Sequence, residues 1–327
     1  MISEIRSTLF QRFLQRRFGA GKRFTRAYIK YFEKAQAVSL RSARDWQRLD
    51  TTRRMWFDFA LSTNQRGKAL VHLLRDRQPM KGKRYLDIGC GFGGTLVAGA
   101  RAGAACTGIE IDPIRMDLAW ENLEDFRVAA PILKQDALAP DLPDRLGQFD
   151  FISLSDVVEH VLDATQLFRN LGLLLAPGGL LYVQIPNPDS VEFVAADGHF
   201  GLFGITLLPR EDAIDYHGRR FQFDYDVGDY YSLDECLHLF DEAGLHPKLI
   251  PSLHHPARRM TDLESLLASL TEARRRFAEP DPALHEKLAN AYEDYLRRLH
   301  SDRARLTERD FRNRYLRNFW TFLASPK

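Results

Sequence analysis

The chain has 327 residues, of which 45% are hydrophobic and 28% charged, as in an ordinary soluble globular protein with one large domain and additions. Its net charge of +2 combines a basic segment 1–83 (net +14), an acidic segment 84–256 (net −16) and a mildly basic segment 257–327 (net +4). No apolar run has the length of a membrane helix or the pattern of a signal peptide, and the three cysteines have no metal-ligand or redox spacing, so we expect a cytoplasmic protein.

The basic segment 1–83 is helical in pattern. Ile2, Ile5, Leu9 and Phe13 recur at three- and four-residue steps with arginines on the other faces, and residues 26–38 and 54–77 also look helical. We interpret 1–83 as a helical cap whose basic face is solvated, covers a substrate, contacts an anionic membrane or contacts a phosphate-rich partner. Nucleic acid is the least favoured partner, because the chain has no RNA-binding module and its middle is acidic.

The stretch YLDIGCGFGGT (85–95) begins the acidic segment. It predicts a strand, a glycine turn and a helix, which is the nucleotide-binding opening of a doubly wound α/β domain. Its glycines also fit the spacing of a dinucleotide site, so a dehydrogenase is an alternative. Asp87, two residues before the first glycine of the turn, suits a cationic ligand better than a phosphate.

Strand-like and helix-like runs alternate from this point to residue 256. Strands are predicted at 84–90, 106–112, 131–138, 149–155, 180–187 and 246–252, and helices at 115–126, 165–179 and 232–245. The alternation predicts a Rossmann-like, doubly wound, mostly parallel sheet. An aromatic insertion at 187–231 follows the fifth strand and has no clear period, which is typical of a functional lid. Residues 257–327 read as a helical, Arg-rich extension.

Five stretches in this order carry a family resemblance: LDIGCGFGG, GIEID, QDAL, FDFISLSDVVEHV and LLAPGGLLYVQIPN. Segment 84–256 resembles the class I S-adenosylmethionine-dependent methyltransferases, closest in motifs to small-molecule enzymes of the ubiquinone-biosynthesis type. The resemblance implies a seven-stranded sheet and S-adenosylmethionine as cofactor. It does not extend to 1–83 or 257–327, where the residue pattern predicts helices added at both ends of the domain.

The resemblance also implies the cofactor-binding residues. Asp87 would orient the glycine turn and the methionine portion, Glu110 would accept hydrogen bonds from the ribose hydroxyls, and Asp136 would face the adenine. The full expected set is Asp87, Gly89, Cys90, Gly91, Gly93, Glu110, Ile111, Asp136, Ala137, Leu154 and Ser155.

Residues after the fourth strand are candidates for catalysis. His160 is a candidate general base for methyl transfer to a hydroxyl. In DVVEH, Asp156, Glu159 and His160 would share one face of a helix start, where they are plausible ligands for a divalent ion. Similar ubiquinone-type enzymes hold magnesium at such an arrangement, so Mg²⁺ is a second candidate cofactor. The alternative is that Glu159 and His160 only brace the helix.

The aromatic insertion offers a second group of polar candidates: His199, Asp215, His217 and Arg219. His217 is a candidate base held by Asp215, or an ordinary packed lid histidine. We expect methylation of a hydroxyl on a small-molecule, saccharide or lipid-linked acceptor, with N- or C-methylation and an inactive binding module as alternatives. The sequence leaves the acceptor and the oligomeric state open.

Overall fold

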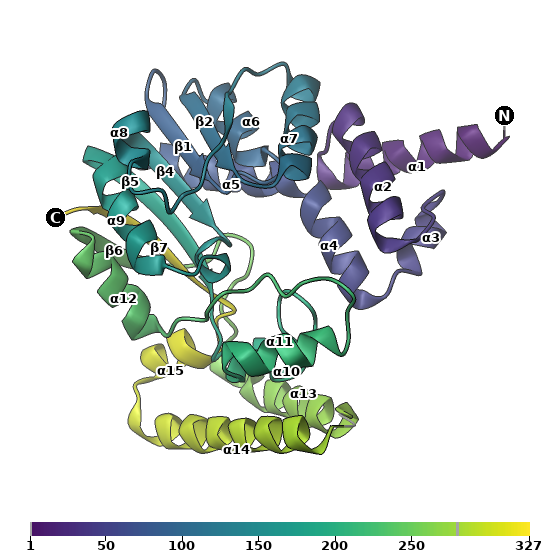
Figure 1. The fold of residues 1–327 in the computed structure, drawn as a ribbon, viewed down its shortest axis with the longest axis vertical. Helices are drawn as coiled ribbons and strands as arrows, with labels where there is room; N and C mark the ends of the chain where they lie inside the picture. The colour runs from purple at the N-terminus through teal and green to yellow at the C-terminus, as the bar shows by residue number, and fades with distance from the viewer. Residues whose placement is uncertain (1, 279–280) are drawn as a thin grey trace. The chain divides into compact units, whose positions relative to one another are not determined.

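The computed structural model describes residues 2–278 and 281–327, with side chains from residue 8 onward (Figure 1). Two compact units are described separately: residues 1–154, 170–182 and 326, and residues 155–169, 183–325 and 327. The strands are β1 (Arg84–Ile88), β2 (Ala105–Glu110), β3 (Ile132–Lys134), β4 (Phe149–Ser155), β5 (Leu175–Pro186), β6 (Leu245–Ile250) and β7 (Phe319–Pro326). The helices are α1 (Ile2–Phe18), α2 (Lys22–Gln36), α3 (Ala43–Gln47), α4 (Thr51–Leu61), α5 (Thr63–Arg75), α6 (Gly94–Arg101), α7 (Pro113–Phe126), α8 (Leu142–Leu146), α9 (Ala164–Leu174), α10 (Val191–Ala195), α11 (Arg210–Gly218), α12 (Leu233–Glu242), α13 (Leu263–Arg276), α14 (Pro282–Arg305) and α15 (Glu308–Tyr315), with short 3₁₀ turns η1 (Val158–His160), η2 (Ile205–Leu207) and η3 (Met260–Asp262).

The seven strands form one sheet in the order β3-β2-β1-β4-β5-β7-β6, in which β7 is antiparallel. β1 pairs in parallel with β2 and β4, and β2 pairs in parallel with β3. The predicted doubly wound fold is therefore confirmed. No helix within residues 2–278 and 281–327 has both the length and the apolar character to cross a membrane.

Two local predictions were wrong. The last residues of the predicted helical extension form β7, whose Trp320, Thr321 and Phe322 are buried. This apolar run forms a strand because it pairs with β5 on one side and β6 on the other. The pairing joins residues that are distant in sequence, so the local sequence pattern does not reveal it. The predicted helix 165–179 ends at Leu174, and β5 begins at once, because Pro177 lacks the N–H that a helix needs.

The glycine turn between β1 and α6 has the conformation that its sequence predicts. Gly89, Gly91 and Gly93 have φ values of 64°, 51° and 72°, in the left-handed region that side chains disfavour. Asn122 on α7 donates a hydrogen bond of 2.8 Å to the carbonyl of Phe92 in this turn. The turn is thus fixed both by its own glycines and by a neighbouring helix.

The basic amino-terminal helices share a core with this turn. The ring centroids of Phe24 and Tyr28 on α2 lie 5.8 Å and 5.5 Å from that of Phe92. On α1 the buried side chains include Phe10 and Leu14, whereas the predicted stripe residues Leu9 and Phe13 are 58% and 38% exposed. The face predicted for α1 was therefore wrong at these two positions, and the side chains of Ile2 and Ile5 lie outside the described ones.

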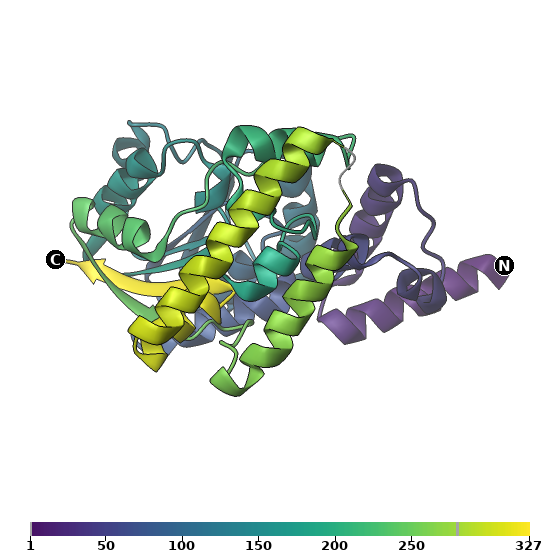
Figure 2. The same cartoon turned by 90° about the horizontal axis from the view of Figure 1, so that it is seen from below.

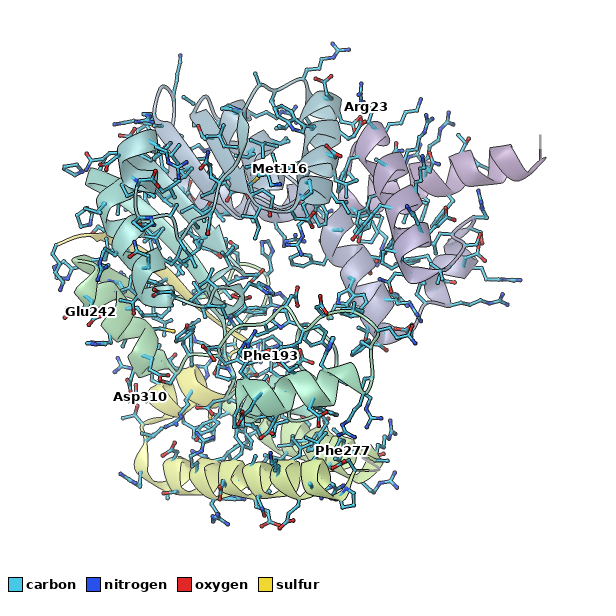
Figure 3. All side chains as sticks on the ribbon, viewed as in Figure 1. Arg23, Met116, Phe193, Glu242, Phe277 and Asp310 are labelled. Carbon is cyan, nitrogen blue, oxygen red and sulfur yellow. The ribbon has the colours of Figure 1, made fainter. Side chains whose placement is uncertain are left out.

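Helix α2 is attached to α7, beside which it lies in Figure 1. The Asp125 carboxylate of α7 accepts hydrogen bonds of 2.9 Å from the backbone N–H groups of Arg23 and Phe24, which lie in the first turn of α2. The Arg23 side chain (labelled in Figure 3) pairs with Glu121 at 2.6 Å. Segment 1–83, which the sequence predicts as a cap, is therefore joined to segment 84–256 by direct contacts between α2 and α7.

The second unit is organised around the segment that follows β5. The Asn187 side chain, which is fully buried, donates to the carbonyls of Arg314 and Arg317 at 2.8 Å and 2.7 Å. Asp189 pairs with Arg298 of α14 and with Arg314 of α15. These contacts connect the start of the aromatic insertion to the chain that leads into β7; Figure 2 shows α13 and α14 of this unit.

Candidate functional site

The carboxylate of Asp87 lies inside the first unit at the end of β1. The parallel register of β1 and β4 places Asp87 opposite Ser153, and the Ser153 hydroxyl donates to Asp87 Oδ1 at 2.5 Å. The Tyr85 hydroxyl donates to Ser153 Oγ at 2.7 Å. Asp87 is only 6% exposed, so two successive hydrogen bonds hold a buried carboxylate beside the glycine turn.

Glu110 ends β2 and faces the same turn. Its Oε2 accepts a hydrogen bond of 2.9 Å from the Gly91 N–H, and its Oε1 accepts hydrogen bonds from the N–H groups of Ile111 and Asp112 at 2.8 Å and 3.0 Å. Glu110 is 6% exposed, whereas the apolar side chain of Ile111 is 64% exposed. The turn therefore carries a second buried carboxylate with an exposed apolar residue next to it.

The two carboxylates interact electrostatically. Burial raises the pKa of Asp87 to about 7, the Ser153 hydrogen bond opposes this rise, and the negative charge of Glu110 adds to it. Two buried acids that repel each other in this way are stabilised by a cation. The two carboxylates therefore suit a ligand that carries a sulfonium and an ammonium group, and they do not suit a pyrophosphate.

The remaining predicted cofactor residues lie on neighbouring elements. Asp136 is exposed after β3, and its Oδ1 accepts from the N–H of Leu138. Asn170 of α9 holds the adjoining loop by donating to the carbonyls of Ala137 and Ala139 at 2.7 Å and 3.0 Å. Of the other predicted positions, Cys90, Gly93 and Leu154 are buried, and Gly89, Gly91 and Ser155 are partly exposed.

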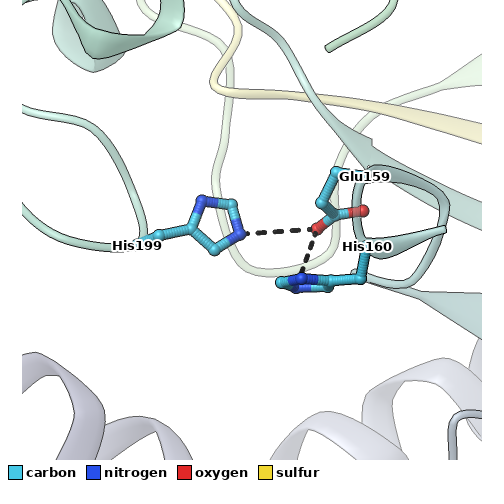
Figure 4. Close-up of side chains that lie close together, drawn as sticks. All are labelled: Glu159, His160 and His199. Atoms are coloured by element: carbon cyan, nitrogen blue, oxygen red, sulfur yellow. Dashed lines mark ion pairs between the residues drawn. The ribbon is translucent and has the colours of Figure 1, made fainter. Parts of the chain in front are cut away.

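A separate polar cluster lies within the second unit. Glu159 and His160, in the 3₁₀ turn after β4, meet His199 from the aromatic insertion (Figure 4). Glu159 Oε1 lies 3.9 Å from His160 Nε2 and 3.7 Å from His199 Nε2. Glu159 is 1% exposed, and neither of its carboxylate oxygens has a hydrogen-bond partner among the described residues.

Each imidazole of the cluster also has a polar contact at its Nδ1 atom. His160 Nδ1 lies 2.7 Å from the carbonyl of Asp226 and donates its proton to this oxygen, and Nε2 is the ring atom that faces Glu159. His199 Nδ1 lies 3.3 Å from the Tyr230 hydroxyl and 3.7 Å from the Asp197 carboxylate. Burial alone would lower the pKa of His199, but Asp197 and Glu159 outweigh burial and raise it to about 10.

Asp156 does not join this cluster. Its φ of 56° turns the chain sharply at the end of β4, and its Oδ1 accepts from the Gln184 side chain at 3.1 Å. The expectation that Asp156, Glu159 and His160 share one helical face was wrong, because a left-handed residue followed by a 3₁₀ turn replaces the helix start. A non-glycine residue in this conformation is uncommon and often marks a functional region.

The predicted pair of His217 and Asp215 is also not formed. Both lie on α11 two residues apart, a spacing that puts them on different faces of a helix. Asp215 pairs with Arg219 at 2.9 Å, while His217 is 1% exposed and packs against aromatic rings, of which Phe200 is 4.5 Å away. Burial lowers the pKa of His217, as expected of a neutral packed histidine.

Sequence reasoning missed the residues that support each site. Ser153 is one residue in a buried strand, and only the β1–β4 register reveals its partner. Asn122, Asp197 and Tyr230 likewise act through contacts that are distant in sequence. His199 was recognisable only as a polar residue in the aromatic insertion, without an indication of its neighbours.

The strand order and the glycine turn define a doubly wound α/β protein, in which two buried acids at the ends of β1 and β2 lie beside that turn. Comparison with known proteins agrees: the methyltransferase domain family matches residues 62–247, more than half of the chain. The chain belongs to this family and is an S-adenosylmethionine-dependent methyltransferase.

Individual relatives are distant. A ubiquinone biosynthesis O-methyltransferase of Acinetobacter baylyi is 28% identical over 178 residues, covering 54% of this chain and 68% of that protein. The enzyme of the same name from Marinobacter nauticus is 33% identical over 145 residues, covering 43% and 59%. The solved structure of magnesium protoporphyrin IX methyltransferase from Synechocystis PCC 6803 aligns with a TM-score of 0.44 at 16% identity, covering 69% of this chain and 92% of that one.

Proposed function

We propose that the protein transfers the methyl group of S-adenosylmethionine to a hydroxyl of a small-molecule, saccharide or lipid-linked acceptor. The observation that carries cofactor binding is the pair of buried carboxylates, Asp87 and Glu110, at the glycine turn without a cationic partner among the described residues. The name shared by the relatives supports oxygen as the acceptor atom.

The residues of the first unit would bind and orient the cofactor, which supplies an electrophilic methyl group on a sulfonium. Asp87, held by Ser153, would neutralise positive charge in the methionine portion. Glu110 would accept hydrogen bonds from ribose hydroxyls while it keeps the Gly91 N–H in place. The exposed Ile111 would offer an apolar surface to the adenine ring.

Methylation of a hydroxyl also requires removal of its proton. His160 supports this step, because the Asp226 carbonyl engages its Nδ1 proton, so Nε2 is the nitrogen that would take up the proton in the neutral imidazole. In the chain, Glu159 and His160 follow β4 directly, and ligands of open α/β sheets bind at the carboxyl ends of the strands. His217 and Asp215 have no part in this proposal.

N- or C-methylation and an inactive binding module remain the alternatives for the same fold. The basic faces of α1 and α2 support peripheral contact with an anionic membrane, which would suit a lipid-linked acceptor. Mg²⁺ does not fit the residues after β4, because magnesium prefers oxygen ligands and Asp156 is turned away to Gln184.

Calorimetry tests the cofactor. We expect S-adenosylmethionine and S-adenosylhomocysteine to bind the full chain with one site each, and NAD not to bind, because the site offers carboxylates in place of phosphate donors. Incubation with labelled S-adenosylmethionine and phenolic or sugar acceptors then reports transfer. Binding of NAD alone would favour a dehydrogenase, and cofactor binding without transfer to any acceptor would favour the inactive module.

The pKa of Asp87 predicts how cofactor affinity depends on pH. A bound cation favours the ionised carboxylate, so the cofactor should bind more weakly as the pH falls below about 7, where Asp87 of the free protein becomes protonated. The loss should approach tenfold per pH unit until the lower pKa of the complex is reached. Titrations between about pH 5.5 and 8 in buffers of different ionisation enthalpy measure both the affinity and the proton released; a flat profile would remove Asp87 from the charged contact.

A further inference from the structure

The geometry of the second unit points to a divalent metal site formed by Glu159, His160 and His199, and we propose that it takes a first-row transition ion such as Zn²⁺. One ligand atom from each of the three side chains lies within 4.8 Å of the other two (Figure 4). Two imidazoles and one carboxylate are ligands of intermediate hardness, and such ligands bind Zn²⁺, Mn²⁺ or Fe²⁺ better than Mg²⁺.

The separations suit ligands around one small ion. Atoms bound at about 2.1 Å in a tetrahedral arrangement are about 3.4 Å apart. The separations from Glu159 Oε1, 3.7 Å and 3.9 Å, are only slightly longer than this, and with all three ligand atoms within 4.8 Å of one another, side-chain rotations would be enough to close the site. The two rings are perpendicular, with an interplanar angle of 88°, and approach Glu159 from different directions.

Burial of a carboxylate that accepts no hydrogen bond among the described residues is the second observation. Glu159 is 1% exposed, and both of its oxygens lack hydrogen-bond donors among residues 8–278 and 281–327. A buried charge without hydrogen bonds is costly, and a metal ion is one of the few partners that compensates it. Asp197 adds a second negative charge behind His199.

The residues around the cluster also hold the two imidazoles in the way that the neighbours of metal-binding histidines do. Each imidazole directs Nε2 toward the cluster and is held at Nδ1 by an oxygen: the Asp226 carbonyl for His160, and the Tyr230 hydroxyl for His199. The loop that carries Asp226 is fixed on the turn, because the Gly228 N–H donates to the Glu159 carbonyl at 2.5 Å. A Cβ at Gly228 would lie 2.6 Å from the Val161 carbonyl oxygen, so this close approach requires glycine.

Three protein ligands leave a coordination position open for an oxygen of water or of an acceptor. Under the proposed function, a metal there would bind the acceptor hydroxyl and lower its pKa, with His160 as a ligand in place of its role as base. This role of the metal in binding the acceptor rests on the proposed function. The metal site itself does not, because metal binding is measured without cofactor or acceptor.

The test is Zn²⁺ binding to the full chain after chelator treatment and removal of chelator. We expect one Zn²⁺ per chain by calorimetry and elemental analysis, a rise in thermal unfolding temperature on metal addition, and a tetrahedral or five-coordinate absorption spectrum with Co²⁺. His199→Gln and Glu159→Gln should each weaken Zn²⁺ binding at least about tenfold. Circular dichroism of each variant without metal checks its fold, and His160→Gln provides an independent variant if one of them unfolds.

Two control variants test whether Zn²⁺ binding is specific to this cluster. Asp156→Asn should leave Zn²⁺ affinity within about twofold, because Asp156 binds Gln184 and is not one of the three grouped ligand side chains. His238→Ala removes a histidine on α12 that is 71% exposed and should also have no effect on the single site. Absence of stoichiometric Zn²⁺ binding in the wild type, or loss of binding with Asp156→Asn but not with His199→Gln, would overturn the proposal whether or not the protein binds S-adenosylmethionine.

Discussion

Replacing Glu110 by alanine should weaken binding of S-adenosylmethionine by about 1–3 kcal/mol, or about 5- to 150-fold in Kd. The substitution removes the acceptor proposed for the ribose hydroxyls and leaves the N–H groups of Gly91, Ile111 and Asp112 without their carboxylate partner. The free energy of binding should therefore fall through lost contacts and through a less ordered turn. Isothermal titration calorimetry at about pH 8, where Asp87 is ionised, gives the Kd directly.

Two variants control for the glycine turn. Glu110→Gln keeps the side-chain shape and one carbonyl acceptor, so its loss of affinity should be smaller than that of Glu110→Ala. Glu124→Ala removes a carboxylate on α7 that is 65% exposed and should leave the Kd unchanged. If Glu110→Ala folds normally and binds the cofactor as the wild type does, Glu110 has no place in the site.

Replacing Asn187 by alanine should lower the free energy of unfolding of the second unit by about 2–4 kcal/mol. Asn187 is fully buried; its Nδ2 donates to two carbonyls of the 314–317 segment, and its Oδ1 accepts from the Asp189 N–H at 3.0 Å. Alanine removes the side-chain partner of one buried N–H group and of two part-buried carbonyls, and backbone groups that lose their partner away from water are expensive. Urea denaturation followed by circular dichroism measures the loss.

The effect should be local to the chain that leads into β7. Amide hydrogen exchange within Phe319–Pro326 should become faster in Asn187→Ala, because the contacts that hold the preceding residues are lost. Asn290→Ala on α14, where Asn290 is exposed, is the matched control and should change stability by less than about 0.5 kcal/mol. Equal stability of the two variants would show that the Asn187 contacts do not hold this segment.

The strand and helix order of segment 84–256 was predictable, because it depends on local signals. Alternation of apolar residues, glycines at a turn and acids at strand ends are readable one element at a time. Asp87 and Glu110 could be assigned to one site because the carboxyl ends of adjacent parallel strands meet at one edge of a sheet. The family resemblance added the cofactor to this geometry.

Contacts between distant residues were not predictable in the same way. β7 has ordinary strand character, but its position between β5 and β6 depends on partners that lie far away in the chain. Residues 187–231 have no period, so their sequence does not show that His199 meets Glu159 and His160 or that His217 is enclosed by phenylalanines.

From sequence alone, this chain is an α/β methyltransferase with two acids at a glycine turn, since backbone periodicity and chain order together with the family motifs suffice for that conclusion. The three-dimensional structure decided which side chains form the second polar cluster. A left-handed Asp156 and a 3₁₀ turn rotate Glu159 and His160 away from the predicted partner and toward His199. Such rotations arise from packing between segments that are distant in the chain, which local sequence pattern does not encode.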